Sequence, residues 1–311
     1  MRDVPVQVPG PAPLAGTLTL PDAPLPAPAV LLAPGSGPVD RDSNHRRTRF
    51  DVTRQLAVAL AGAGIASLRF DKRGVGGSPG DWRAAGLHDN VDDLGAALEL
   101  LRGRPEVDAG RVLLAGHSEG AILATSLAAR GAPVAGLVLL AMSATPGEEL
   151  LRWQARQIAP TLPRPVRALL RLLRTDLEAK VAANHRRIEA TTTDVARIGG
   201  ARINARWHRE FLAYDPREDL RRVSVPVLAL TGSKDLQVPA DDLDVIAAAV
   251  GGPVDTHRVP DLTHTLRRQP GPPSMSAYRR ELKDPVDPLV VDIVVTWCHR
   301  TTTPADGATT A

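Results

Sequence analysis

Short apolar runs alternate with segments of helical period along most of this chain, and this alternation predicts its architecture. The apolar runs have the length of strands and are rich in branched aliphatic residues. They fall at residues 29–33, 66–70, 111–115, 138–142, 227–231 and 254–259. The pattern predicts an α/β fold, with a mostly parallel central sheet that helices cover on both faces.

Two earlier runs, at residues 4–8 and 14–20, predict a different connection. The segment between them reads ProGlyProAlaPro, which is rich in residues that favour turns. Proline is tolerated at the edge of a sheet but not in its centre, because it cannot donate a backbone hydrogen bond. We therefore expect an antiparallel hairpin at the sheet edge.

Apolar residues recur every three or four positions between the strands and predict helices. The first helix carries Val52, Leu56 and Leu60 on one face. Asn90 is the predicted cap of the second helix, whose first turn holds two aspartates at the positive end of the helix dipole. Pro239 and the pair Asp287 and Pro288 are predicted to begin the last two helices, since proline is favoured in the first turn.

The segment at residues 143–206 interrupts the alternation, because it holds only helical patterns, many arginines and four prolines. We interpret it as a helical insertion and name it the cap segment. It divides the core into residues 1–142 and 207–300. Residues 301–311 offer little to bury and are predicted to be disordered.

The charge balance argues against a nucleic-acid partner. The 311 residues hold 38 Lys and Arg against 35 Asp and Glu, a formal net charge of +3, which supplies no broad field for phosphates. Cys298 is the single cysteine, which excludes an intrachain disulfide and a cysteine-rich metal site. No secretion signal is evident at the amino terminus, and no apolar run approaches the roughly 20 residues of a membrane span. We expect a cytoplasmic protein with no membrane partner.

A GxSxG motif lies between a predicted strand and a predicted helix. It reads Gly116, His117, Ser118, Glu119, Gly120. A serine on so sharp a turn needs small residues on both sides, and the turn exposes its hydroxyl as a nucleophile. The same turn directs the N–H of Glu119 toward a reacting carbonyl, at the positive end of a helix.

An oxyanion needs a second hydrogen-bond donor, and the loop after residues 29–33 offers one. This loop reads Pro34, Gly35, Ser36, Gly37, and its glycines let the backbone approach a ligand closely. We expect the N–H of Ser36 to pair with that of Glu119, as in the glycine-rich loops of lipases and esterases. The alternative is a simple turn.

A serine nucleophile also needs a base and an orienting carboxylate at later strand ends. Asp235 follows the strand at 227–231, and His264 follows the strand at 254–259. The order serine, aspartate, histidine is that of the α/β-hydrolases. Asp255 and Asp261 compete for the carboxylate role, but neither lies at a strand terminus. His117 is expected to point away from the serine.

The side chains of Glu119, Asp71 and the arginines of the cap segment are expected to have roles outside the serine chemistry itself. We expect Glu119 to be structural and Asp71 to anchor its own loop by hydrogen bonds. The arginines of the cap segment could favour an acidic substrate, although solvated helix faces are the commoner reason for such residues. They include Arg152, Arg156, Arg167, Arg171 and Arg174.

Five segments together resemble the serine hydrolases of the α/β-hydrolase superfamily, within the bacterial carboxylesterases related to serine aminopeptidases and dienelactone hydrolases. They lie at residues 32–42, 69–78, 116–120, 210–216 and 232–239. The resemblance implies hydrolysis of a small-molecule ester without a metal or organic cofactor, with substrate choice set by the cap segment.

The expected chemistry is acyl transfer from Ser118 to water through an acyl-enzyme. A peptidase, lactonase, thioesterase or acyltransferase would use the same three residues, so the sequence leaves these alternatives open. A ligand-binding protein on the same fold is a further alternative, because fold alone does not determine function. The oligomeric state cannot be read from the sequence.

Overall fold

The central sheet has eight strands, seven of which run in the same direction. The computed structural model describes residues 1–303 apart from residues 12, 47, 163 and 173–175. The strands in spatial order are β1 (Arg2–Val8), β2 (Leu14–Leu20), β6 (Ala66–Phe70), β3 (Ala27–Ala33), β7 (Val107–His117), β8 (Gly136–Leu140), β11 (Val227–Gly232) and β12 (Val254–Val259). Strand β2 pairs antiparallel with both of its neighbours, and the other pairs are parallel. The predicted fold class and the edge hairpin are confirmed.

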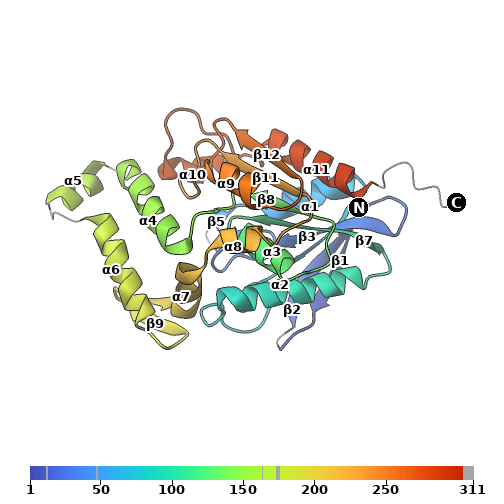
Figure 1. Cartoon of the computed structure of the whole chain (residues 1–311), viewed down its shortest axis with the longest axis horizontal. Coiled ribbons are helices and arrows are strands. Elements are labelled where there is room, and N and C mark those ends of the chain that lie inside the picture. Colours follow the sequence, from blue (N-terminus) through green and yellow to red (C-terminus); the bar gives the residue numbers. More distant parts are fainter. Residues whose placement is uncertain (12, 47, 163, 173–175, 304–311) are drawn as a thin grey trace.

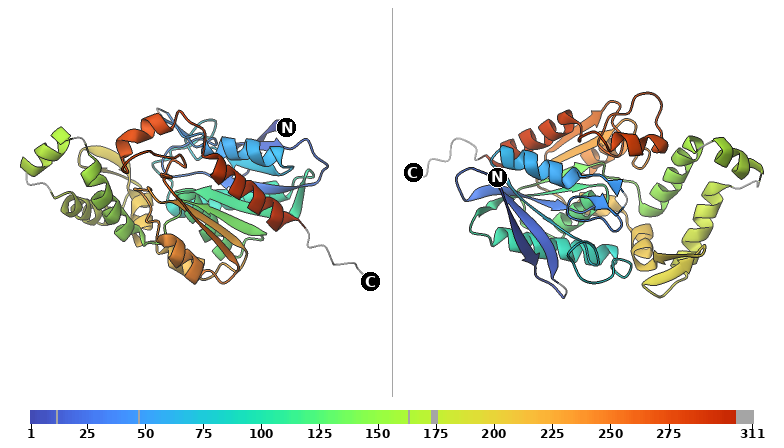
Figure 2. Two further views of the ribbon diagram at one scale, coloured as in Figure 1. Left: turned by 90° about the horizontal axis from the view of Figure 1, so that it is seen from above. Right: turned by 180° about the vertical axis from the view of Figure 1, so that it is seen from behind.

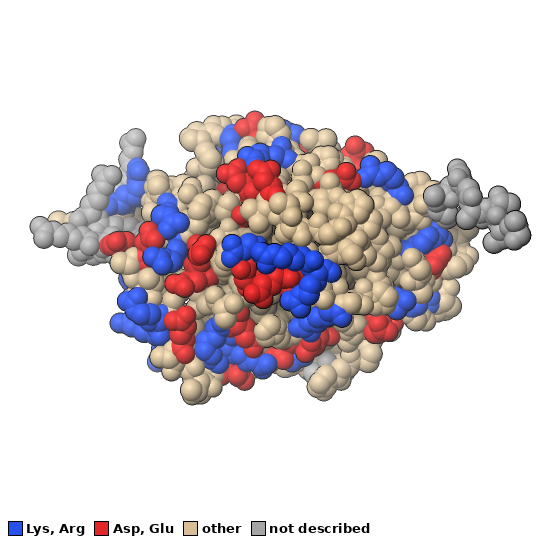
Figure 3. Space-filling view, viewed as in Figure 1, with Lys and Arg blue, Asp and Glu red and all other residues tan. Residues whose placement is uncertain are grey.

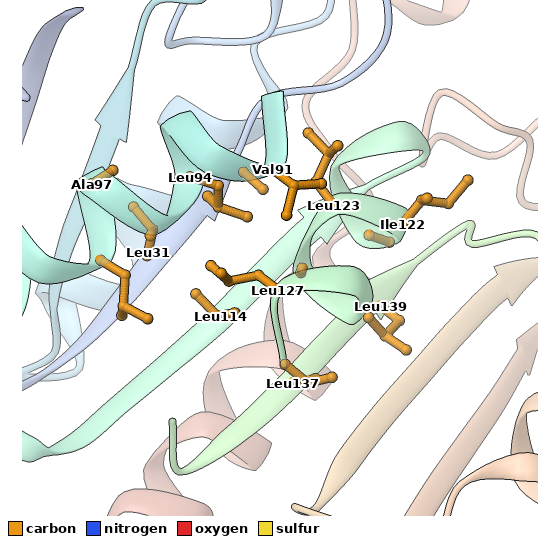
Figure 4. Packing of buried hydrophobic residues seen from close by; sticks show 14 of the residues in the cluster. Leu31, Val91, Leu94, Ala97, Leu114, Ile122, Leu123, Leu127, Leu137 and Leu139 are labelled. Carbon is orange, nitrogen blue, oxygen red and sulfur yellow. The ribbon is translucent and has the colours of Figure 1, made fainter. Parts of the chain in front are cut away.

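Helices cover both faces of this sheet (Figures 1 and 2). Helices α1 (Val52–Gly62) and α11 (Pro288–Thr302) pack on one face, and α2 (Leu87–Arg102) and α3 (Glu119–Ala129) pack on the other. Figure 4 shows Leu94 of α2 and Leu123 of α3 near Leu114 of β7, all of them fully buried. This packing fixes the end of β7, where the chain turns into α3.

Several predicted boundaries are wrong. Helix α2 begins four residues earlier than predicted, at Leu87 with Gly86 as its cap, and Asn90 lies buried inside it. Helix α9 (Asp242–Ala249) begins after Pro239, whose carbonyl accepts the N–H of Asp242 in a preceding turn. Strand β8 ends at Leu140 because Ala141 has a φ of 48°, which extended backbone cannot accommodate.

The cap segment is not purely helical, contrary to its prediction. It contains α4 (Gly147–Ile158), the short 3₁₀ helix η1 (Ala159–Thr161), α5 (Arg164–Leu172) and α6 (Leu177–Glu189), followed by a hairpin of β9 (Val195–Ile198) and β10 (Ala201–Asn204). Gly199 and Gly200 form the hairpin turn with φ angles of 57° and 84°, a conformation that glycine adopts without strain. The segment extends to one side of the sheet, and α7 (Ala205–Ala213) leads back to the core (Figure 1).

The remaining elements are short. They are β4 (Asn44–His45), β5 (Thr48–Arg49), α8 (Pro216–Leu220), η2 (Met275–Ala277) and α10 (Tyr278–Glu281). The predicted tail begins too early, since α11 continues to Thr302, and residues 304–311 lie outside the described residues. No helix in the described part of the chain is long and apolar enough to cross a membrane.

Candidate active site

Ser118 lies on a sharp turn between β7 and α3, and its backbone has φ 57° and ψ −123°. This conformation is strained for any residue other than glycine, and such strain persists only where the surrounding structure enforces it. The flanking glycines make the turn possible. A Cβ at Gly116 would lie 2.1 Å from the carbonyl carbon of Gly120, and a Cβ at Gly120 would lie 2.5 Å from the carbonyl oxygen of Ala33.

The structure brings Ser118, His264 and Asp235 into one hydrogen-bonded chain. Nε2 of His264 lies 3.1 Å from Oγ of Ser118, and Nδ1 of His264 lies 2.8 Å from Oδ2 of Asp235. The side chain of Asp235 has 0% of its surface exposed, and that of His264 has 6%. A proton on Nδ1 would therefore be held by a buried carboxylate, which leaves Nε2 available to the serine hydroxyl.

Backbone groups hold Asp235 in place. Its second oxygen, Oδ1, accepts the N–H of Gln237 at 2.7 Å and the N–H of Val238 at 2.9 Å. Burial raises the pKa of the nearby Tyr278 hydroxyl, and the charge of Asp235 raises it further. The carboxylate is thus fully used, with one oxygen on the backbone and the other on the imidazole.

The loop that carries His264 is anchored by buried charged groups. Arg267, which is 2% exposed, donates to the carbonyls of Thr265, Phe50 and Asp284 at 2.6, 2.7 and 3.2 Å. Burial lowers the pKa of Arg267 to about 10. On the other side, Glu281 accepts hydrogen bonds from the hydroxyls of Thr263 and Thr265 at 2.8 and 3.1 Å.

His117 lies against the loop of His264, a contact that the sequence did not predict. Its Nε2 lies 2.8 Å from the carbonyl oxygen of His264, and the two rings are 4.8 Å apart. Burial, with a contribution from the adjacent His264, lowers the pKa of His117 to about 3. The neutral ring of His117 therefore donates to the backbone of His264 and supports its loop.

Glu119 is buried, 3% exposed, and its side chain makes structural contacts as expected. Its Oε1 accepts hydrogen bonds from Nζ of Lys72, Nδ2 of Asn90 and Nε1 of Trp207, each at 3.2 Å. Lys72 also donates to the carbonyl of Gly35 at 2.9 Å. The start of α3 is thereby joined to the loop after β3, to α2 and to α7.

A cavity of about 340 Å³ lies between the core and the cap segment. Ser36 and Gly37 of the loop after β3 line it, together with all three donors to Glu119. The remaining wall is contributed by the loop before α2, by α4 and by the region of β10 and α7, through Arg73, Trp82, Ala85, Leu151, Arg202, Ile203, Asn204 and His208. The cavity thus combines apolar walls with cationic groups, and no Asp or Glu is among these lining residues.

The competing carboxylates have other partners. Asp255 accepts hydrogen bonds from Trp297 and Arg300, and Asp261, which is exposed, forms an ion pair with the partly buried Lys234 at 2.7 Å. Asp71 anchors its loop as predicted, since it accepts hydrogen bonds from Arg41 and from the N–H of Gly77. Burial by itself would raise the pKa of Asp71, but these hydrogen bonds outweigh burial and hold the pKa below its ordinary value.

Two arginines of the cap segment form exposed ion pairs and are solvated. Arg152 and Arg156 both pair with Glu178, at 3.4 and 2.8 Å. Lys and Arg are interspersed with Asp and Glu over the face of the molecule in Figure 3. Arg174 and the side chain of Arg171 lie outside the described residues.

Sequence reasoning missed the contacts of Lys72, Trp207 and His117. Lys72 lies in the segment that carries the family resemblance, but nothing in its local pattern indicates a contact with Glu119, 47 positions away. Trp207 follows the cap segment and reaches Glu119 only because α7 packs back onto α2. Within the described ranges, no three His, Cys, Asp or Glu side chains gather as a potential metal site.

Comparisons with known proteins agree with this architecture. The family model described as "Serine aminopeptidase, S33" matches residues 48–270. Esterase EstD of Thermotoga maritima is 26% identical over 291 residues, which is 91% of this chain but only 65% of that protein. An uncharacterized protein of Mycobacterium tuberculosis is 41% identical over 101 residues, 32% of this chain and 35% of that one.

Solved structures share the fold at low sequence identity. Est1E of Butyrivibrio proteoclasticus has a TM-score of 0.63 at 17% identity and covers 96% of this chain and 98% of its own. The proline iminopeptidase of Mycobacterium smegmatis has a TM-score of 0.64 at 17% identity, with 96% and 99% covered. The match to the family model spans well over half of the chain, and the chain therefore belongs to the serine aminopeptidase S33 family, with an α/β-hydrolase fold.

Proposed function

We propose that this protein hydrolyses carboxylic esters through an acyl-enzyme, with Ser118, His264 and Asp235 as its catalytic triad. The observation that carries the proposal is the continuous chain from Oγ of Ser118 to Nε2 of His264 at 3.1 Å, and from Nδ1 to Asp235 at 2.8 Å. Each group has the chemistry that its role requires. The esterase name of the Thermotoga maritima relative supports an ester as the substrate.

In the first half of the reaction, neutral His264 accepts the proton of Ser118 as the serine oxygen attacks the ester carbonyl. The imidazolium that forms is stabilised by the buried carboxylate of Asp235. His264 then donates the proton to the departing alcohol, which leaves the acyl group on Ser118. In the second half, His264 removes a proton from a water molecule, whose oxygen attacks the acyl carbon. The bond from this carbon to Oγ of Ser118 then breaks, which releases the acid, and His264 returns the proton to the serine oxygen.

The N–H groups of Ser36 and Glu119 are the proposed oxyanion donors. Glu119 is the first residue of α3, so its N–H lies at the positive end of the helix. A Cβ at Gly35 would lie 3.6 Å from the carbonyl oxygen of His117, which places the loop after β3 against the serine turn. Among the described residues, neither N–H donates a hydrogen bond to a protein acceptor, so both remain available to a ligand.

The 340 Å³ cavity is the proposed binding site for one side of the ester. It is joined to the serine turn through Glu119, whose three donors line it. Its tryptophan and aliphatic walls suit an apolar group, because buried polar groups without partners would be unfavourable there. Peptidase, lactonase, thioesterase and acyltransferase activities require the same triad, so amides, lactones and thioesters belong in the substrate screen.

The test is hydrolysis of p-nitrophenyl acetate and longer esters by the wild type and by Ser118→Ala. The variant should lose at least about 10⁴-fold in kcat while keeping its unfolding midpoint. A fluorophosphonate probe should label the wild type but not the variant. Ser224→Ala, which changes an exposed serine outside the site, is the matched control. Substantial turnover by Ser118→Ala, or no labelling of the wild type, would overturn the proposal.

A further inference from the structure

Lys72 connects the two segments that carry the proposed oxyanion donors. It follows β6, and its side chain is 7% exposed. One ammonium group donates both to the carbonyl of Gly35 at 2.9 Å and to Oε1 of Glu119 at 3.2 Å. These partners come from the loop after β3 and from the start of α3, which are separated by more than 80 residues in the sequence.

The contact with Gly35 constrains the N–H of Ser36, because both groups belong to the same peptide unit. A trans peptide is planar, with its carbonyl and its N–H pointing in opposite directions. When Lys72 holds the carbonyl of Gly35 on one side, the N–H of Ser36 must face the other side. Rotation of this peptide would redirect the N–H of Ser36 and would break the hydrogen bond between the ammonium of Lys72 and the carbonyl of Gly35.

The contact with Glu119 acts on the second donor. Oε1 of Glu119 receives three hydrogen bonds, and these hold the side chain of the residue whose own N–H is the other proposed donor. Oε2 of Glu119 is buried and has no hydrogen-bond partner among the described residues. An incompletely satisfied buried ion pair is poor evidence of a role in stability alone, since apolar side chains of similar size are often at least as favourable.

We propose that Lys72 is a positioning residue that sets the orientation and separation of the N–H groups of Ser36 and Glu119. This inference rests on the proposed ester hydrolysis. Lys72 acts on the transition state through the peptide of Gly35 and Ser36. Loss of its ammonium therefore lowers kcat, because the oxyanion forms only as the reaction proceeds, and leaves the binding of an ester too small to fill the cavity largely intact.

The test compares Lys72→Met with the wild type on p-nitrophenyl acetate. Removal of one oxyanion donor costs on the order of 100- to 1000-fold in kcat, so a misdirected donor should cost roughly 10- to 100-fold, with KM changed less than about twofold. A trifluoromethyl ketone inhibitor, whose adduct with serine carries an oxyanion, should lose affinity by a similar factor. Lys283→Met, at an exposed lysine, is the matched control.

The double variant Lys72→Met/Glu119→Gln addresses the charge that Lys72→Met would leave buried on Glu119. It removes both charges and still leaves the carbonyl of Gly35 without its donor, so its kcat should stay low even where its stability is regained. If Lys72→Met does not fold, the kcat of the double variant tests the inference in its place. A wild-type kcat in the double variant, or a raised KM with unchanged kcat in Lys72→Met, would overturn the inference.

Ser118→Ala separates this inference from the proposed function. If Ser118→Ala is inactive and the lysine variants have normal kcat and normal inhibitor affinity, the role of Lys72 is wrong and ester hydrolysis stands. If Ser118→Ala keeps its activity, the proposed function is wrong, and the inference about Lys72 is overturned with it.

Discussion

Nε2 of His117 lies 2.8 Å from the backbone carbonyl of His264, and the two imidazole rings are 4.8 Å apart. The residue before the proposed nucleophile thus supports the loop of the proposed base. Burial favours the neutral ring, because a charged His117 would be desolvated and would lie against His264. The lowered pKa of His117, about 3, follows from the same enclosure.

This pKa predicts a dependence of stability on pH. In the unfolded chain His117 takes up a proton near its ordinary pKa of about 6.5, whereas in the folded protein it does so only near pH 3. Between these pH values protonation favours the unfolded chain, so the free energy of unfolding falls as the pH is lowered. Between pH 7.5 and pH 5 the loss should be about 2 kcal/mol. The contribution of His117 to this loss should be absent in His117→Gln.

Urea unfolding of both proteins at the two pH values measures this effect. Burial also lowers the pKa values of His185 and His208, so the informative quantity is the difference between the wild type and the variant. Equal losses of stability in the two proteins would contradict the prediction.

Asp235→Asn should impair the proposed base without removing it. An amide could present its N–H₂ to Nδ1 and favour the wrong tautomer of His264, so kcat should fall by roughly 10³- to 10⁴-fold with KM little changed. Steady-state kinetics on p-nitrophenyl acetate provides the measurement. Asp261→Asn is the control, because Asp261 is exposed, lies three residues from His264 and has a φ of 59° that asparagine tolerates. A larger loss in this control would reverse the assignment.

Gly116→Ala should prevent the serine turn from forming. Its Cβ would lie 2.1 Å from the carbonyl carbon of Gly120, and relief of this clash would require the backbone of the turn to shift. We expect a loss of at least about 3 kcal/mol in unfolding free energy, or no folded protein, as measured by thermal unfolding. Gly62→Ala should be neutral or stabilising, since a Cβ at Gly62 meets nothing within 4 Å and alanine favours a helix. Wild-type stability in Gly116→Ala would be incompatible with this geometry.

Arg267→Met should weaken the loop that carries His264. Three carbonyls lose the donor that now serves them, and the expected cost is about 2 to 4 kcal/mol, measured by urea unfolding at pH 7.5. Arg267→Lys should recover part of this loss, because an ammonium can reach some of the same carbonyls. Arg279→Met, at an exposed arginine, should change stability by less than about 0.5 kcal/mol. Equal effects at both positions would exclude the anchoring role.

Trp82→Ala should enlarge the cavity and affect only substrates that fill it. For p-nitrophenyl esters of long or aromatic acids, we expect KM to rise roughly 3- to 10-fold, since an aromatic wall contributes buried apolar contact. Kinetics on the acetate ester should stay near those of the wild type. The proposed binding site would be wrong if all esters, long and short, responded equally.

The strands and their chemistry were predictable because both depend on local order in the sequence. Apolar runs mark buried parallel strands, and Ser118, Asp235 and His264 each follow one of them. Parallel strands end at the same edge of a sheet, so residues far apart in the chain could be expected to lie close together there. Helix starts were less predictable. Asn90 resembles a cap in sequence, yet it lies inside α2, where it donates to Glu119.

The sequence by itself therefore determined the sheet, the fold class, the family resemblance and the order of the three candidate residues, because periodicity and strand-end motifs involve neighbours along the chain. Only the tertiary structure decided that Lys72 joins Gly35 to Glu119, that His117 supports His264, and that the cap segment ends in a hairpin beside a cavity. The physical reason is that hydrogen bonds and burial are set by packing between distant segments, and no periodicity within one segment records which distant group will lie against it.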